Sequence, residues 1–153
     1  MFKKILVPLD GSGLGECALQ ELKNVAGEGS VVILLRAMEM VSSLALESEL
    51  DSESANNRLV DVERKNEKNA RRKLDNVAAN LKKKGLEAVI HIAWGHPADI
   101  IVDFASKKKV DLIVISTHGR GGISRWAFGS VTDKVLRSAT VPVLVVTPKG
   151  CHL

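Results

Sequence analysis

Short apolar runs alternate with longer stretches of helical periodicity along most of the chain. The runs are rich in Val, Ile and Leu and have the length of buried strands. We predict strands over residues 3–8, 31–37, 88–93, 112–116 and 141–146. Few polar residues interrupt them, which is typical of parallel strands whose two faces are both covered by helices.

Three of the connections between these runs have the spacing of amphipathic helices. After the first strand, Ser12 can cap a helix that Gly27 and Gly29 would stop. Pro97 begins the second helix, at a position where proline is favoured, and the third covers residues 129–139. The apolar positions expected to face the sheet are Leu14, Ala18, Leu22, Val25, Ile100, Ile101, Phe104, Ala105, Val131, Val135 and Leu136.

The remaining connection is much longer. Apolar residues recur in it at steps of three or four from Leu59 to Leu81, which predicts a long helix over residues 57–84, ended by Gly85. Its charged positions are expected to face water. Residues 39–57 before it are acidic, rich in serine and weakly periodic, so we expect a mobile excursion that can hold a short helix over residues 41–50.

These elements predict one domain of the α/β class. Strands and helices alternate and the chain ends on a strand, an order typical of a parallel sheet with helices on both faces. A length of 153 residues is that of one domain with its own core. Neither an internal repeat nor a linker divides the sequence, so we expect a single domain over residues 1–153 with a five-stranded parallel sheet.

The charge of the chain is local. The net charge is +4, yet residues 39–57 hold five acidic residues and no basic one, whereas residues 58–84 hold ten basic and four acidic residues. Aromatic residues make up 3% of the chain, too few for a platform on which bases stack. We therefore expect no nucleic-acid partner.

Nothing in the sequence indicates export or membrane insertion. The N-terminal apolar run ends at Pro8, too soon for a signal peptide, and the other runs fall far short of the ~20 residues of a membrane span. The two cysteines, Cys17 and Cys151, allow one disulfide but form no framework motif, a pattern that suits a reducing compartment. We expect a cytoplasmic protein without a membrane partner.

Candidate chemistry gathers at the carboxyl ends of the strands, where open parallel sheets bind their ligands. The richest end is STHGRGG, residues 116–122, which Gly129 and Ser130 follow at the start of a helix. Glycine lets the backbone approach a ligand closely, and a helix N-terminus presents N–H groups that suit a phosphate. The pattern predicts a phosphate site in which Arg120 or Arg125 offsets charge; the alternative is a flexible connection with an ordinary helix start.

Other phosphate and metal sites are disfavoured by their motifs. The pattern G-x4-G-K-[ST] is absent, and the dinucleotide fingerprint would need a glycine where Glu16 stands. A receiver domain would need an aspartate at the end of the third strand, where Ala93 and Trp94 stand. The four histidines lack metal-ligand spacing, and no Ser-His-Asp or Cys-His arrangement can be argued.

Three long stretches carry a resemblance to a known family. They are KKILVPLDGS at the start, WGHPADIIVDFASKKKVDLIVISTHGRGG in the second half and GSVTDKVLRSATVPVLVV near the end. In them the chain resembles the universal stress proteins of the UspA superfamily, nearly from end to end. The resemblance implies a Rossmann-like universal stress protein domain with the sheet order 3-2-1-4-5.

The nucleotide-binding branch of that family carries the motif G-x2-G-x9-G-[ST]. The frame falls here on Ser116, Gly119, Gly129 and Ser130, so the first glycine is replaced by serine. Serine carries a Cβ and fits where φ is negative or where there is room. Three of the four motif positions therefore support ATP binding, and Ser116 departs from the pattern.

The resemblance also implies roles at the strand ends. Pro8 and Ala37 would line the adenine, Asp10 would bond the ribose or lie near the metal, and backbone N–H groups of Gly119 and residues 129–131 would wrap the phosphates. From the residues alone, Asp10 can also be a helix-entry turn residue, and His118 either a phosphate contact or an exposed loop side chain. The candidate site residues are Pro8, Asp10, Ala37, Ser116, His118, Gly119, Arg120, Gly122, Gly129, Ser130 and Val131.

The family resemblance implies a stress-response sensor or regulator that binds ATP together with Mg²⁺ or Mn²⁺. No base stands beside a γ-phosphate, so we expect at most slow hydrolysis rather than an enzyme. Two alternatives stay open: a dimeric interaction module without nucleotide, which Ser116 favours, and a slow ATPase or nucleotidyl-transferring relative. The implied sheet order makes the uncharged strand Val141–Val146 an edge strand, and we expect a homodimer that pairs through it; the alternative is that the C-terminal tail, residues 147–153, covers this edge.

Overall fold

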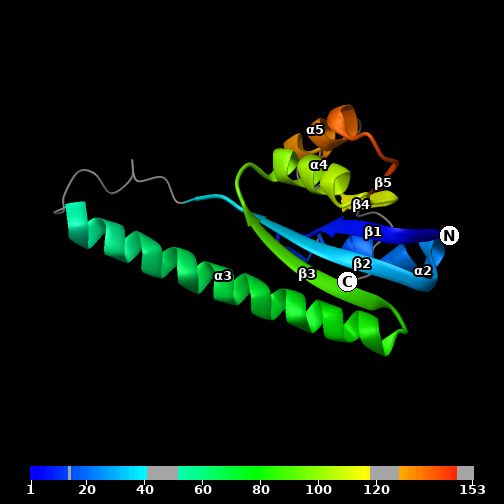
Figure 1. Cartoon of the computed structure of the whole chain (residues 1–153), viewed down its shortest axis with the longest axis horizontal. Helices are drawn as coiled ribbons and strands as arrows, with labels where there is room; N and C mark the ends of the chain where they lie inside the picture. The colour runs from blue at the N-terminus through cyan, green and yellow to red at the C-terminus, as the bar shows by residue number, and fades with distance from the viewer. Residues whose placement is uncertain (14, 41–51, 118–127, 148–153) are drawn as a thin grey trace.

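A computed structural model describes residues 1–13, 15–40, 52–117 and 128–147. Five parallel strands form one sheet in the order β3-β2-β1-β4-β5 (Figure 1). The strands are β1 (Phe2–Pro8), β2 (Ala26–Met38), β3 (Glu87–Trp94), β4 (Leu112–Ser116) and β5 (Val143–Val146). The predicted α/β class, the parallel pairing and the strand order are confirmed.

The strand boundaries agree closely with the prediction except in β2. This strand begins five residues before the predicted start because Ala26 pairs with Phe2 of β1. The Ser30 hydroxyl holds the irregular stretch, since it donates to the Phe2 carbonyl at 2.6 Å and accepts the Gly27 N–H at 2.8 Å. Gly27 and Gly29 therefore lie inside a strand, and the prediction that they stop a helix is wrong.

The predicted first helix is in fact two short helices. α1 (Cys17–Gln20) and α2 (Leu22–Val25) are separated at Glu21. No side chain caps α1, whose N-cap is Glu16, so the prediction that Ser12 caps this helix is wrong. The Ser12 hydroxyl accepts the Gly15 N–H at 3.1 Å and closes the turn that precedes α1.

The three longer helices follow the predicted periodicity. α3 (Ser52–Lys83) begins five residues before the predicted start, and Gly85 follows its end in the left-handed region, at φ +79°. α4 (Pro97–Lys107) and α5 (Ser130–Ser138) lie where they were predicted. The short helix expected over residues 41–50 falls outside the described residues. Within the described ranges, no helix combines the length and the apolar character needed to cross a membrane.

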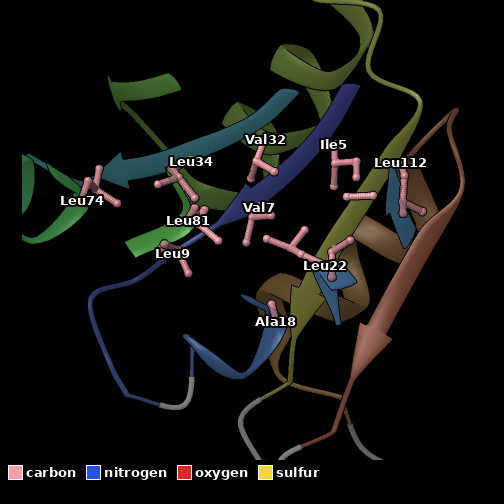
Figure 2. Packing of buried hydrophobic residues seen from close by; sticks show 12 residues of the cluster. Ile5, Val7, Leu9, Ala18, Leu22, Val32, Leu34, Leu74, Leu81 and Leu112 are labelled. Atoms are coloured by element: carbon pink, nitrogen blue, oxygen red, sulfur yellow. The ribbon is translucent and has the colours of Figure 1, made fainter. Parts of the chain in front are cut away.

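Helices cover both faces of the sheet, as predicted. Successive strand residues alternate between two buried layers: Ile5 and Val7 of β1 belong to the layer under α1, α2 and α3 (Figure 2), and Leu6 belongs to the layer under α4 and α5. The buried helical residues are Ala18, Leu22, Leu74 and Leu81 in the first layer and Ala98, Ile101, Ala105 and Val135 in the second. Because helices cover the two faces of the sheet, a ligand can approach the central strands at their carboxyl ends.

Candidate functional site

A cavity of about 290 Å³ opens at the carboxyl ends of β1 and β4, beside the start of α5. The chain order reverses at β1, because β2 and β4 lie on opposite sides of it. Ligands of open parallel sheets bind at such a point. The described residues that line the cavity are Pro8, Leu9, Asp10, Gly15, Leu35, Ala37, Pro97, Ile101, Ile115, Ser116, Gly129, Ser130, Val131 and Thr132.

Most of the predicted site residues meet in this cavity, although they are far apart in the sequence. The seven that line it are Pro8, Asp10, Ala37, Ser116, Gly129, Ser130 and Val131. The other four predicted residues, which fall outside the described residues, are His118, Gly119, Arg120 and Gly122.

Asp10 organises the loop that follows β1. Its Oδ1 accepts the Ser12 N–H at 2.9 Å and the Ser12 hydroxyl at 2.6 Å. The Leu9 N–H donates to the Leu35 carbonyl at 2.9 Å and so continues the pairing of β1 with β2. Asp10 is thus a turn residue that also lines the cavity, and both interpretations left open by the sequence fit this geometry.

Two glycines shape the same loop. Gly11 has φ +81°, in the left-handed region that favours glycine. A Cβ at Gly15 would lie 2.8 Å from Asp10 Oδ1, closer than a real contact allows. Gly15 therefore permits the close approach of the backbone to the Asp10 carboxylate. In the sequence, Gly15 stands one residue before Glu16, the position where the dinucleotide fingerprint would need its last glycine.

Arg36 braces this loop from β2. Its Nη1 donates to the Leu9 carbonyl at 3.2 Å, and a Cβ at Gly11 would lie 3.4 Å from that same nitrogen. Burial lowers the pKa of Arg36, and the attraction of Asp10 opposes this shift. Arg36 was not among the candidate residues, because it stands within an apolar strand run that matches no motif.

The N-terminus of α5 forms another wall of the cavity. Gly129 is its N-cap, with φ −60° and ψ 155°, and no side-chain hydrogen bond caps the helix. The first intrahelical bond joins the Asp133 N–H to the Gly129 carbonyl at 2.9 Å. The N–H groups of Ser130 and Val131 precede that bond and have no helical partner, so this end of the helix suits an anion such as phosphate.

Ser116 is accommodated where the family motif has glycine. It ends β4, is 6% exposed and is not among the described residues with positive φ. Its carbonyl accepts a hydrogen bond from Thr132 Oγ1 at 3.4 Å, which joins β4 to α5. The serine is therefore unstrained, and the cavity is present beside it.

Four further residues that line the cavity were not among the predicted site residues. Leu35 and Ile115 come from strands, and Ile101 and Thr132 come from the faces of α4 and α5 that turn toward the sheet. No motif marks these positions. Helical periodicity is the one available signal, and it places Ile101 on the inner side of its helix.

The donor set for a metal ion is small. Among the described residues, no group of three His, Cys, Asp or Glu side chains could hold a metal. Asp10 is the one carboxylate among the described lining residues. Mg²⁺ that accompanies a nucleotide is commonly held by the phosphates, water and one or two carboxylates. The residues present fit an ion that arrives with a nucleotide, and Asp10 is the described carboxylate that would hold it.

Solved structures share this fold. The structure of protein MJ0577 matches with a TM-score of 0.79 and 29% identity over 96% of both chains. The structure of the universal stress protein from Archaeoglobus fulgidus in complex with dAMP matches with a TM-score of 0.60 and 23% identity, over 94% of this chain and 96% of that chain.

Sequence comparisons give the family. Universal stress protein MJ0577 of Methanocaldococcus jannaschii is 31% identical over 158 residues, 98% of each chain. Universal stress protein MJ0531 of the same organism is 32% identical over 146 residues, 95% of this chain and 82% of that protein. The model of the Universal stress protein family matches residues 1–147. The chain therefore belongs to the universal stress protein family.

Proposed function

We propose that this universal stress protein binds ATP, with Mg²⁺ or Mn²⁺, in the cavity between β1, β4 and α5, and that it acts in the cytoplasm as a sensor or regulator of the stress response. One observation carries the proposal: Asp10 and the uncapped N-terminus of α5 line the same cavity. A carboxylate accepts hydrogen bonds from ribose hydroxyls, and a helix N-terminus suits phosphates, so both polar parts of a nucleotide have partners.

The composition of the wall supports a base as the third part of the ligand. Pro8, Leu35 and Ala37 line the side of the cavity formed by β1 and β2. Small-molecule sites are mostly apolar with a few placed polar groups, and the 290 Å³ of this cavity lies near their lower limit of roughly 300 Å³. A related chain with the same fold was solved with dAMP, which makes an adenine nucleotide the first ligand to test.

Binding without rapid hydrolysis is the activity we propose. Asp10 is the one titratable side chain among the described lining residues, and its Oδ1 already accepts two hydrogen bonds from Ser12. A general base must reach the proton that it removes from the attacking water. A carboxylate committed to its own loop is poorly placed for that work, so we assign Asp10 to binding.

Gly129→Val tests the phosphate end of the site. A Cβ at Gly129 would meet no atom of the described residues within 4 Å, so the larger side chain is not expected to clash with them in the ligand-free protein. In the complex it would stand at the α5 N-terminus, where the phosphates are proposed to lie. We expect the affinity for ATP, measured by titration calorimetry, to fall at least tenfold, about 1.4 kcal/mol.

Ala79→Val is the matched control, because Ala79 is exposed on α3 and does not line this cavity. The control is expected to bind ATP like the natural protein. Unchanged affinity in a folded Gly129→Val variant would contradict the role of Gly129. A natural protein that binds no ATP would contradict the proposed function and favour the dimeric interaction module.

Ser116→Gly tests the departure from the family motif. The substitution removes only the hydroxymethyl group, and the carbonyl that accepts the Thr132 hydrogen bond stays in place. We expect ATP affinity to be equal or slightly higher in the same calorimetric titration. A marked loss would show instead that the serine hydroxyl is itself a ligand contact.

A further inference from the structure

A second cavity lies beside the first, between the carboxyl end of β2 and the middle of α3. It measures about 430 Å³. Leu9, Asp10, Ala37 and Pro97 line both cavities, so the two spaces share one wall. The second cavity differs in chemistry, because its own lining is rich in hydrogen-bond donors. None of its described lining residues belongs to the family motif.

Arg36 is the main polar group of the second cavity. Its guanidinium donates from Nη1 to the Leu9 carbonyl. Its Nε is buried and has no hydrogen-bond partner among the described residues. A buried donor without a partner destabilises the folded protein. Arg36 as a whole is half-buried, so an acceptor in the cavity can reach only the part of its guanidinium that is not buried, and an anionic acceptor would also offset the charge.

Three side chains of α3 add donors on the opposite wall. They are Asn66, Asn69 and Lys73, which lie on one helix face because they are three and four residues apart. In the described part of the chain, no ion pair or side-chain hydrogen bond engages them. The cavity therefore combines a guanidinium, an ammonium and two amides from two different elements, which is the donor set of a phosphate site.

Two carboxylates limit which phosphate fits. Asp10 stands in the shared wall, and the exposed Glu39 also lines the second cavity, so its charged side chains sum to zero. A bare anion gains little in such a cavity. A ligand with hydroxyl donors for Asp10 and a phosphate for Arg36 and Lys73 satisfies both kinds of group. A phosphorylated ribose has this combination.

We propose that the second cavity binds a phosphate carried on the 2′ or 3′ oxygen of the ribose of a nucleotide whose base lies in the first cavity. The protein would then prefer adenine nucleotides phosphorylated on the ribose over those with a 5′-phosphate alone. This proposal rests on the proposed function for the place of the base. The presence of the donors Arg36 and Lys73 in the second cavity does not depend on the proposed function. Free phosphate is the other ligand that could supply the phosphate group.

The experiment compares nucleotides that differ by one phosphate. Titration calorimetry of the natural protein with AMP, adenosine 2′,5′-bisphosphate and adenosine 3′,5′-bisphosphate is expected to show at least tenfold tighter binding of one bisphosphate, about 1.4 kcal/mol. Arg36→Gln and Lys73→Gln are each expected to reduce this preference to about threefold or less. Lys73 is exposed on α3, so its variant keeps the test valid if Arg36→Gln disturbs the β1 loop.

Arg72→Gln is the matched control, because Arg72 is exposed on α3 and lines neither cavity. It is expected to keep the full preference. ATP binding without any preference for a bisphosphate would overturn the ribose-phosphate site and leave the proposed function intact. A preference that survives both Arg36→Gln and Lys73→Gln would also overturn it.

Titrations with ATP and with inorganic phosphate separate the remaining outcomes. If the natural protein binds no ATP, the proposed function fails, and with it the nucleotide as the carrier of the phosphate. Binding of inorganic phosphate that Lys73→Gln removes would then support the donor set as a site for free phosphate. Absence of phosphate binding as well would overturn the site entirely.

Discussion

Replacing Leu34 with alanine is expected to lower the free energy of unfolding by about 3 kcal/mol, within the roughly 2–5 kcal/mol measured for such changes in buried cores. Leu34 lies on β2, is 0% exposed and belongs to the layer between the sheet and α3 (Figure 2). Leu74 and Leu81 are the buried residues of α3 in this layer. Truncation would leave a cavity in this layer. The strands β1 and β2 lie inside the sheet and cannot easily move to fill the cavity.

Urea denaturation followed by circular dichroism measures the effect. Val89→Ala on β3 is the matched control, because Val89 is a strand residue that remains 41% exposed. We expect the control to cost less than about 1 kcal/mol, since an exposed position loses little burial. Equal losses for the two variants would show that burial in this layer does not determine the stability of the sheet.

The parallel strands could be predicted well because strands that are buried on both faces have unbroken apolar sequences. β4 has the predicted bounds, and all five of its residues are buried. Alternation of polar and apolar residues is absent in such strands, so unbroken apolar runs mark them. The strand order could not be predicted from such runs. It came from the family resemblance, because no local pattern in β1 or β4 indicates which strands are the neighbours of these two.

The stretch between β1 and the predicted second strand shows where local patterns fail. Leu22 and Val25 have helical spacing, yet Glu21 separates two helices of four residues each. The start of β2 holds Gly27 and Gly29, residues that are unfavourable in strands. Pairing with Phe2 and the two hydrogen bonds of Ser30 make this stretch a strand, and these contacts depend on tertiary structure.

The candidate site divides in the same way. Asp10, Gly129 and Ser130 stand at a strand end or a helix start, and these places can be identified along the sequence. Ile101 and Thr132 enter the cavity only because α4 and α5 pack on the sheet with a particular rotation. Lining residues at the end of a strand or the start of a helix could therefore be predicted. Lining residues that depend on how the helices pack on the sheet required the structure.

Replacing Val145 with lysine is expected to dissociate the homodimer that we propose to form through β5. In the described part of the chain, β5 pairs with β4 on one side and with no strand on the other. The carbonyls of Pro142 and Val146 face β4, since they accept the N–H groups of Ile113 and Thr117 at 3.0 Å. Alternate residues of a strand bond to opposite sides, so Val143 and Val145 direct their backbone groups away from β4.

Within the described residues of β5, no charged residue or proline protects the outer edge against pairing. Its four residues are Val143, Leu144, Val145 and Val146, all half-buried and uncharged. Edge strands commonly carry a charge, a bulge or a proline that discourages association. Two copies of β5 can pair antiparallel about a two-fold axis, which closes the interface and continues the sheet across both protomers. We therefore propose this edge as the dimer interface.

Sedimentation equilibrium measures the result. The natural protein is expected at twice the monomer mass of 16.5 kDa. Val145→Lys is expected to raise the dimer dissociation constant at least about a hundredfold, roughly 2.7 kcal/mol, because a lysine from each copy would meet at the paired edge. Val89→Lys places the same charge on the opposite edge strand, β3, and is expected to leave the dimer intact.

Folding of each lysine variant is checked by circular dichroism, because Val145 also packs against the layer under α4 and α5. A folded Val145→Lys variant that remains dimeric would place the interface elsewhere. Dissociation by Val89→Lys would point instead to the β3 edge, where Val89 is already exposed. A natural protein that stays monomeric at micromolar concentration would contradict the dimer itself, and β5 would then end the sheet as an unpaired edge.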